Sequence, residues 1–227
     1  LMGDQWDTVM NYDAFMEPIT WLLTGVEKHS DEFRGDLLGN PDAFTGALRH
    51  HMSRFNQNSL EIAMNELSNH DHSRFLTRTN RRVGRIHTMG PEAANEYINK
   101  GVFREAVVFQ MTWPGAPTIY YGDEVGLCGW TDPDNRRGYP WGREDKELLN
   151  FHKDMIKIHK RLDALMKGSV VFLNGEYKVI SYGRFTDYQS VVVIMNNDYE
   201  PRELNIHVRR LGVPDGAAMR TEILTTE

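Results

Sequence analysis

The sequence predicts an α/β fold in which parallel β/α units come first and an all-β antiparallel domain follows. Across the first two thirds of the 227 residues, short apolar runs alternate with apolar residues at helical spacing. After Gly168 the pattern changes to short strands separated by turn sequences. Strand–helix alternation followed by a run of strands is typical of parallel units joined to a separate β domain. We therefore place the two domains at residues 1–166 and 167–227.

The elements of the first domain follow from apolar spacing and from helix start and stop signals. Strands are expected at residues 8–12, 62–67 and 118–121, and helices at 15–23, 41–55, 103–111 and from 145 to about 167. Asn40 and Pro41 mark a helix start, because Asn caps free amides and Pro fits the first helical position. Pro114 stops the third helix. The last helix carries its apolar residues along one stripe, which predicts that it lies on a core.

The second domain reads as a series of antiparallel strands. They are expected at residues 170–173, 177–185, 190–195 and 203–208, with turns at 174–175, 186–187 and 196–198. A further apolar stretch at 218–224 runs almost to the end of the sequence, so the last strands of this domain can be missing.

Composition and charge exclude several classes of protein. With 40% hydrophobic and 26% charged residues the chain is typical of a soluble globular protein, and no apolar stretch approaches the ~18 residues of a membrane span. The net charge is −6 with scattered Lys and Arg, which argues against a nucleic-acid partner. Cys128 is the only cysteine, so no disulfide can form within the chain, and we expect a reducing, cytoplasmic location. Residues 1–4 are not a signal peptide, but this says nothing about secretion if the parent protein continues upstream.

Polar residues follow two of the predicted strands. His70 and Asp71 come after the second strand, and Asp123 and Glu124 come after the third. Barrel enzymes assemble their active sites at the carboxyl ends of the strands, and enzymes that cleave glycosidic bonds use carboxyl groups there. A His-Asp pair in this position is more often a loop cap or a structural hydrogen-bond pair than a site, and with His72 it could bind a metal. Spacing alone leaves these alternatives open.

Four stretches in order resemble the α-amylase family of glycoside hydrolases. Residues 68–76 (SNHDHSRFL) resemble the end of that family's seventh barrel strand, and residues 115–126 (GAPTIYYGDEVG) resemble the eighth strand and its loop. Residues 3–12 resemble the sixth strand, and residues 132–141 resemble the following loop of the cyclomaltodextrinase, neopullulanase and maltogenic amylase group. The resemblance implies the C-terminal half of a (β/α)8 TIM barrel in residues 1–166, followed by an all-β antiparallel sandwich-like domain.

The resemblance also implies roles for four side chains in a retaining hydrolase of α-1,4-glucans. Asp71 matches the third catalytic carboxylate, which grips two sugar hydroxyls and helps to distort the ring. His70 matches a residue that binds the sugar being cleaved. Asp132 and Arg136 match residues that contact the sugar on the nonreducing side. The implied partner is an α-glucan oligosaccharide such as maltodextrin, cyclodextrin, pullulan or starch.

The chain departs from the family in its reacting groups. The family's nucleophile and proton donor belong to earlier motifs, and nothing here matches them except residues 161–165 (RLDAL), which lie on the last helix and read as helix surface. We therefore expect a fragment that is inactive alone. A non-catalytic homologue that binds carbohydrate or protein is one alternative, and a self-contained α/β domain is another.

Other properties of the parent protein stay open at this stage. The resemblance implies no cofactor or metal in this chain, although calcium is conceivable in the parent because the family's calcium ligands lie mainly in the unmatched half. Whether the parent is a homodimer also stays open, because dimerisation in the neopullulanase-like group uses an N-terminal domain that nothing in this chain matches. Trp113, Trp130 and Trp141 are candidates for stacking on sugar rings, with packing in the core or in loops as the alternative.

Overall fold

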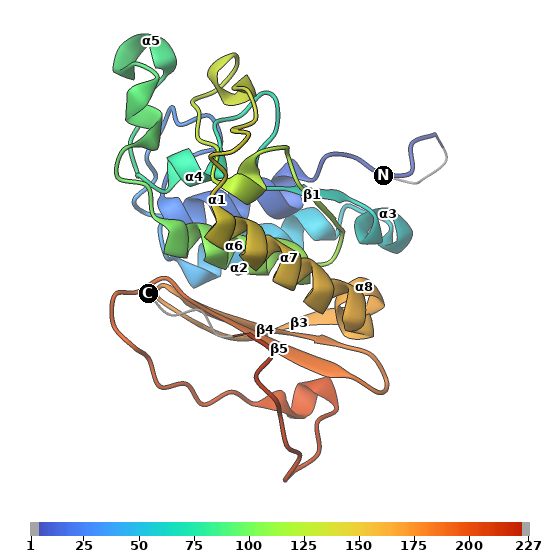
Figure 1. Ribbon diagram of the computed structural model, residues 1–227. Coiled ribbons are helices and arrows are strands. Elements are labelled where there is room, and N and C mark those ends of the chain that lie inside the picture. The colour runs from blue at the N-terminus through green and yellow to red at the C-terminus, as the bar shows by residue number, and fades with distance from the viewer. Residues whose placement is uncertain (1–4, 224–227) are drawn as a thin grey trace.

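The computed structural model describes residues 5–223 and arranges them as a layer of helices against a small antiparallel sheet (Figure 1). The sequence motif residues Gly3 and Asp4, and Leu224 of the last predicted strand, lie outside the described residues. The helices are α1 (Glu17–Thr24), α2 (Pro41–Met52), α3 (Gln57–Glu61), α4 (Phe75–Arg78), α5 (Ile86–Met89), α6 (Lys100–Thr112), α7 (Lys146–Arg161) and α8 (Asp163–Lys167). The strands are β1 (Met64–Glu66), β2 (Ala116–Thr118), β3 (Ser169–Glu176), β4 (Val179–Phe185) and β5 (Ser190–Asn196). Within the described residues, no helix is both long and apolar enough to span a membrane.

Three segments of the first part run parallel and side by side. β1 pairs with β2 in register Met64 to Ala116, and Met10 forms a parallel bridge to Met64 on the other edge of β1. The spatial order is therefore Met10, β1, β2, which confirms consecutive parallel β/α units. The predicted strand at 8–12 is reduced to this bridge, because the chain turns into a single π-helical turn at Tyr12.

The predicted strand at 118–121 is wrong, since β2 occupies Ala116–Thr118. The strand begins earlier than predicted because Gly115 lets the backbone approach β1 closely. A Cβ atom at Gly115 would lie 2.5 Å from Nδ2 of Asn65. Asn65 Nδ2 also donates to the Pro114 carbonyl, at 2.9 Å. The two tyrosines that come after β2 leave the sheet, and the Tyr121 carbonyl accepts a hydrogen bond from Arg74 instead.

The helices agree with their start signals. Asn40 caps α2, with its Oδ1 accepting from the Ala43 amide at 3.0 Å, and Asp145 caps α7 through the Glu147 and Leu148 amides. The predicted continuous helix from 145 to 167 is broken at Leu162, whose extended backbone separates α7 from α8. The Ala164 amide then bonds to Gln189 Oε1 next to the sheet, which draws α8 toward the sheet.

The second part forms a single antiparallel sheet in the order β3-β4-β5. The predicted turn at 174–175 is wrong, because β3 continues through an irregular pairing to Glu176 and the chain reverses at residues 177–178. Lys178 takes a left-handed backbone with φ 64°, and its amide donates to the Gly39 carbonyl. The hydrogen bond to Gly39, in the helical part of the chain, therefore holds the turn of this hairpin at residues 177–178.

No strand forms at residues 203–208 or at 218–223, contrary to the sequence prediction. The chain crosses the sheet instead of extending its edge, because Leu211 packs onto Gly183 in β4, where a Cβ atom would lie 2.2 Å from the leucine side chain. The Leu211 carbonyl also accepts from Ser190 Oγ. The C-terminal part thus supplies one sheet, and no second sheet of a sandwich is formed there within the described residues.

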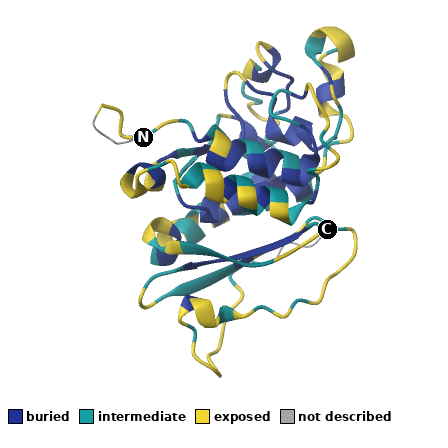
Figure 2. Ribbon diagram, turned by 180° about the vertical axis from the view of Figure 1, so that it is seen from behind, coloured by how far each residue is buried: buried dark blue, intermediate teal, exposed yellow. Residues whose placement is uncertain are grey.

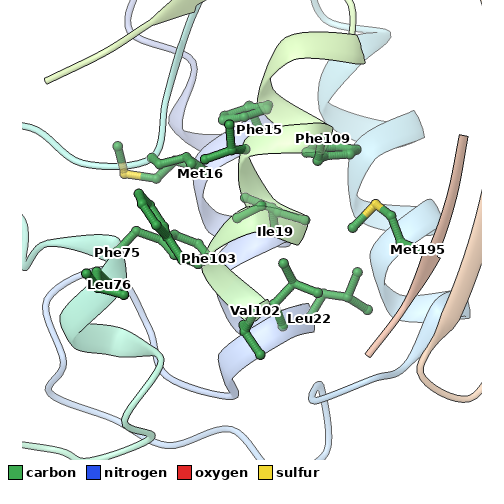
Figure 3. Close-up of a cluster of buried hydrophobic side chains, with 14 of the residues drawn as sticks. Phe15, Met16, Ile19, Leu22, Phe75, Leu76, Val102, Phe103, Phe109 and Met195 are labelled. Atoms are coloured by element: carbon green, nitrogen blue, oxygen red, sulfur yellow. The ribbon is translucent and has the colours of Figure 1, made fainter. Parts of the chain in front are cut away.

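A single hydrophobic core joins the helices to the sheet. Phe109 of α6 lies at its centre: it stacks on Phe15 and Trp113, and its ring meets Tyr182 of β4 edge to face. Figure 3 shows Met195 of β5 facing the same cluster. Burial concentrates in the helix layer and in the central strand of the sheet, and it extends into the loops after β1 and β2, whereas residues 197–222 are mostly exposed (Figure 2). The loop after β2 adds Cys128 and Trp130 to this core, and the loops after β1 and β2 carry polar groups as well.

Candidate functional site

The loop after β1 is organised by the side chain of Asn69. Its Oδ1 accepts hydrogen bonds from the amides of Asp71 and His72 at 3.0 and 3.1 Å, which closes an Asx turn. Its Nδ2 donates to the Tyr12 hydroxyl at 2.9 Å and more weakly to Glu66. A buried side chain therefore fixes the backbone that presents Asp71.

His70 and Asp71 point outward from this loop. Nε2 of His70 lies 3.4 Å from Oδ1 of Asp71, and the two side chains are 55% and 54% exposed. An exposed pair at this distance contributes little to stability. The two groups are instead available to hydrogen-bond a polyol.

The loop after β2 brings Asp132 and Arg136 to the same place. The two side chains form an ion pair, with Nε of Arg136 2.9 Å from Oδ1 of Asp132. The same Nε donates to the His70 carbonyl at 3.1 Å. The structure thus brings all four predicted residues to one rim, at the carboxyl ends of β1 and β2. Their roles in binding or catalysis remain predictions.

Asn135 joins the two loops from beneath. Its Nδ2 donates to the carbonyl oxygens of both Asn69 and His72, at 3.0 and 2.7 Å. Sequence reasoning missed this residue, because an Asn inside a polar loop carries no signal of the distant carbonyls that it will bind.

Glu66 is a further buried group that sequence reasoning missed. It ends β1 with 6% of its surface exposed, and burial raises the pKa of its carboxyl, against the lowering effect of the hydrogen bond from Asn69. Burial likewise raises the pKa of Tyr12, which shares Asn69 as a partner. The available signal was a lone glutamate inside the apolar run at 62–67. The rim therefore rests on buried titratable groups whose pKa values are raised, as well as on exposed charges.

Among residues 5–223, His70, Asp71 and His72 do not belong to any group of three side chains placed to hold a metal ion. His72 is buried, with its ring edge-on to Tyr12 and to His29, and burial lowers the pKa of its imidazole to about 3. One other group of ligand atoms does lie close together there, at Glu27, His29 and Asp31. Its oxygens are already bound by amides and, at Asp31, by Arg85.

The tryptophans separate into two kinds. Trp113 and Trp130 have no exposed surface, and Trp130 Nε1 donates to the Gly90 carbonyl, so both pack in the interior. Trp141 is 80% exposed, and its ring centroid lies 4.4 Å from that of Tyr139. Of the three candidates, Trp141 alone has a surface on which a sugar ring could stack.

Asp123 and the stretch at 161–165 take structural positions. Asp123 is buried and accepts from Arg74 Nη1 at 2.8 Å. Asp163, in the stretch that imitates the nucleophile motif, pairs with Lys167 and accepts from the Tyr188 hydroxyl, beside the C-terminal sheet. Both observations agree with a structural interpretation of these carboxylates.

Comparison with known proteins identifies the family. The model of the α-amylase catalytic domain matches residues 3–161. Over 216 residues the chain is 33% identical to neopullulanase 2 of Thermoactinomyces vulgaris, covering 93% of this chain and 32% of that protein. It is 33% identical to a cyclomaltodextrinase of Thermoanaerobacter pseudethanolicus, over 87% of this chain and 30% of that protein. The chain spans about a third of the length of these relatives.

Solved structures agree with this result. A cyclomaltodextrinase structure matches 86% of this chain and 29% of its own, with a TM-score of 0.69 and 30% identity. The debranching enzyme of Nostoc punctiforme matches 93% of this chain and 41% of its own, with a TM-score of 0.76. At 24% identity the second likeness concerns the fold alone.

Proposed function

Because this chain belongs to the α-amylase family of glycoside hydrolases, we propose that it carries one side of an α-glucan site. Residues 1–166 would be the C-terminal half of a (β/α)8 barrel, and residues 167–227 its C-terminal β domain. The parallel order Met10, β1, β2 supports this, since it fits strands six, seven and eight of such a barrel. Active sites of these barrels lie at the carboxyl ends of the strands, where His70 and Asp71 stand.

The proposed reaction is hydrolysis of α-1,4-glucosidic bonds with retention, by double displacement. Positive charge develops on the sugar ring in the transition state, and the Asp71 carboxylate would stabilise that charge while gripping the ring hydroxyls. His70 would hold the sugar being cleaved, and Asp132 with Arg136 would hold its neighbour. The observation that carries this assignment is the bond from Arg136 Nε to the His70 carbonyl, which joins both binding elements.

The nucleophile and the general acid would come from other parts of the complete protein. Asp71 can stabilise a transition state only when a second group attacks the anomeric carbon and a third protonates the leaving oxygen. The catalysts in this scheme are carboxyl groups, so the chemistry itself requires no cofactor. Maltodextrin, cyclodextrin, pullulan and starch are the substrates to try, since relatives carry the names neopullulanase and cyclomaltodextrinase.

The test compares the purified 227-residue chain with the protein encoded by the complete gene. Both are incubated with maltotriose and with β-cyclodextrin, and the reducing ends released are measured. We expect turnover by the complete protein only. Turnover by the 227-residue chain at a similar rate would mean that its nucleophile and acid have been overlooked. Tight glucan binding without turnover by the complete protein would instead favour a non-catalytic carbohydrate-binding function.

A further inference from the structure

Arg74 is a buried charge that contacts two separate parts of the loop after β2. It precedes α4 in the loop after β1 and has no exposed surface. Its Nη1 donates to the Tyr121 carbonyl at 2.6 Å and to Asp123 Oδ1 at 2.8 Å, both in the loop after β2. Its Nε donates to the Asn135 carbonyl at 2.9 Å. One side chain thereby ties the first loop to two parts of the second.

The surroundings of the Arg74 guanidinium fix the orientation of its plane, in addition to pairing its charge with Asp123. Its central carbon lies 4.0 Å from the centroid of the Tyr120 ring and 4.9 Å from that of Tyr121. The backbone amide of Arg74 adds a bond to the Gly129 carbonyl at 2.9 Å. A planar fork held by ring contacts can aim its donors in set directions, which a lysine ammonium cannot reproduce.

The bond to Asn135 matters because the next residue in the chain is Arg136. Asn135 is held by Arg74 at its carbonyl and by the Asn69 and His72 carbonyls at its side chain. Arg136 in turn reaches both Asp132 and the His70 carbonyl. Any loosening of Asn135 would therefore move the ion pair that is proposed to face the substrate.

We propose that Arg74 is the positioning residue for the Asp132–Arg136 pair, acting through the Asn135 carbonyl. In this role it holds the loop at 129–137 against the loop at 69–72, so that the sugar-binding groups are preorganised before substrate arrives. The effect on sugar binding rests on the proposed function, whereas the effect on the loop does not. A residue that only neutralised Asp123 would need the charge but not the bond from Nε.

Two variants separate positioning from charge neutralisation. Arg74→Lys keeps a cation for Asp123 and removes the bond to Asn135. The double variant Arg74→Met/Asp123→Leu removes both buried charges together, which avoids the unpaired carboxylate that would threaten folding. Arg184→Lys is the matched control, because Arg184 is also buried and binds two carbonyls, of Thr112 and Gly168, away from the rim.

The first readout is amide hydrogen exchange of the peptide covering 129–137. Loss of one buried hydrogen bond corresponds to about tenfold faster exchange. We expect this in Arg74→Lys and in the double variant, with no change in Arg184→Lys. The proposal would be overturned if the exchange rate of 129–137 in the double variant equalled that of the unsubstituted protein. It would also be overturned if the exchange rate rose equally in the Arg184→Lys control.

The second readout is steady-state kinetics of the complete protein on maltotriose. We expect KM to rise about tenfold and kcat to stay within twofold, because the pair is proposed to bind substrate and transition state alike. Equal loss of kcat in the Arg74 and Arg184 variants would indicate a general structural role and overturn the kinetic part. If the complete protein has no glucan activity, the proposed function fails while the exchange result still decides the role of Arg74.

Discussion

The loops after β1 and β2, which form the rim, and the C-terminal sheet differ in the kind of hydrogen bond that holds each of them in place. In the sheet, β3, β4 and β5 pair backbone to backbone in an antiparallel register that is regular except between Phe172 and Asn174 of β3. At the rim, single side chains reach backbone atoms far away in sequence: Arg74 binds the carbonyl of a residue 61 positions away, and Asn135 binds one 66 positions away. The sheet therefore depends on a repeated pattern, and the rim depends on individual residues.

The two regions also bury different groups. The sheet turns Ile180, Tyr182 and Val193 toward the shared core. The rim buries groups that are costly to remove from water, namely Arg74, Glu66 and His72. Such groups are tolerated where they hold a site in shape, and they are where sequence rules and structure are expected to disagree. The contrast predicts that core substitutions lower stability, and that substitutions of the exposed rim groups change activity more than stability.

The largest expected loss of stability comes from Phe109→Ala in the core. Phe109 has no exposed surface and touches rings from both the helices and the sheet, so its removal should lower the free energy of unfolding by about 3–5 kcal/mol. Urea unfolding followed by circular dichroism measures this, with the exposed Trp6→Ala as control, for which a change within about 0.5 kcal/mol is expected. Two separate transitions in the unsubstituted protein would break the idea of one shared core.

The difference between the regions explains what could be predicted from the sequence. Strand period and turn residues placed β4 and β5 closely, and Asn40 and Asp145 marked two helix starts correctly. These signals are local, because they depend on neighbours within a few residues. The prediction failed where a distant contact decided the outcome, as at residues 203–208, which cross the sheet once Leu211 packs on Gly183.

The same reasoning applies to the site. Motif resemblance named His70, Asp71, Asp132 and Arg136, and the structure brings them to one rim. The groups that hold them there were not predicted, because neither Asn135 nor Arg74 belongs to a periodic pattern. A sequence motif identifies groups that meet the substrate more readily than groups that meet only the backbone.

The next largest effect is expected at the rim, from Asp71→Asn in the complete protein. Loss of a preorganised charge at the reacting centre typically costs ~3–4 kcal/mol, or roughly 10²–10³-fold in kcat. Folding should be unaffected, since the Asp71 side chain is half exposed. Steady-state rates on maltotriose measure the effect, with Asp187→Asn in an exposed turn as control. An unchanged kcat with only a raised KM would assign Asp71 to binding.

A smaller, pH-dependent effect is expected from His72 beneath the rim. Burial lowers the pKa of folded His72 to about 3, whereas the unfolded chain takes up a proton near 6.5. Between these values the unfolded state binds more protons, so the stability from neutral His72 is present above pH 6.5 and is lost as the pH falls toward 3. The slope is about 1.4 kcal/mol per pH unit.

Substitution of His72 by Phe would remove this slope and keep a ring against Tyr12 and His29. Urea unfolding at pH 6.5 and at pH 4.5 gives the comparison, and His207→Phe, at an exposed position, is the control. We expect the His72 variant to lose less stability on acidification than the unsubstituted protein and the control. Parallel losses in all three proteins would mean that His72 is not held neutral by the rim.

The smallest effect is expected from Asn40→Ala at the start of α2, where a local signal and its structure agree. Asn40 Oδ1 accepts from the Ala43 amide at 3.0 Å, and replacing such a cap by Ala typically costs ~1 kcal/mol of stability. Asn40→Ser keeps an acceptor and should recover most of the loss. Urea unfolding of the three proteins measures the difference, while exchange in 129–137 should stay unchanged because α2 packs on the core and not on the rim. A faster exchange of the rim in Asn40→Ala would show that the two regions are coupled through the helices, and would end the separation between a core that sets stability and a rim that sets activity.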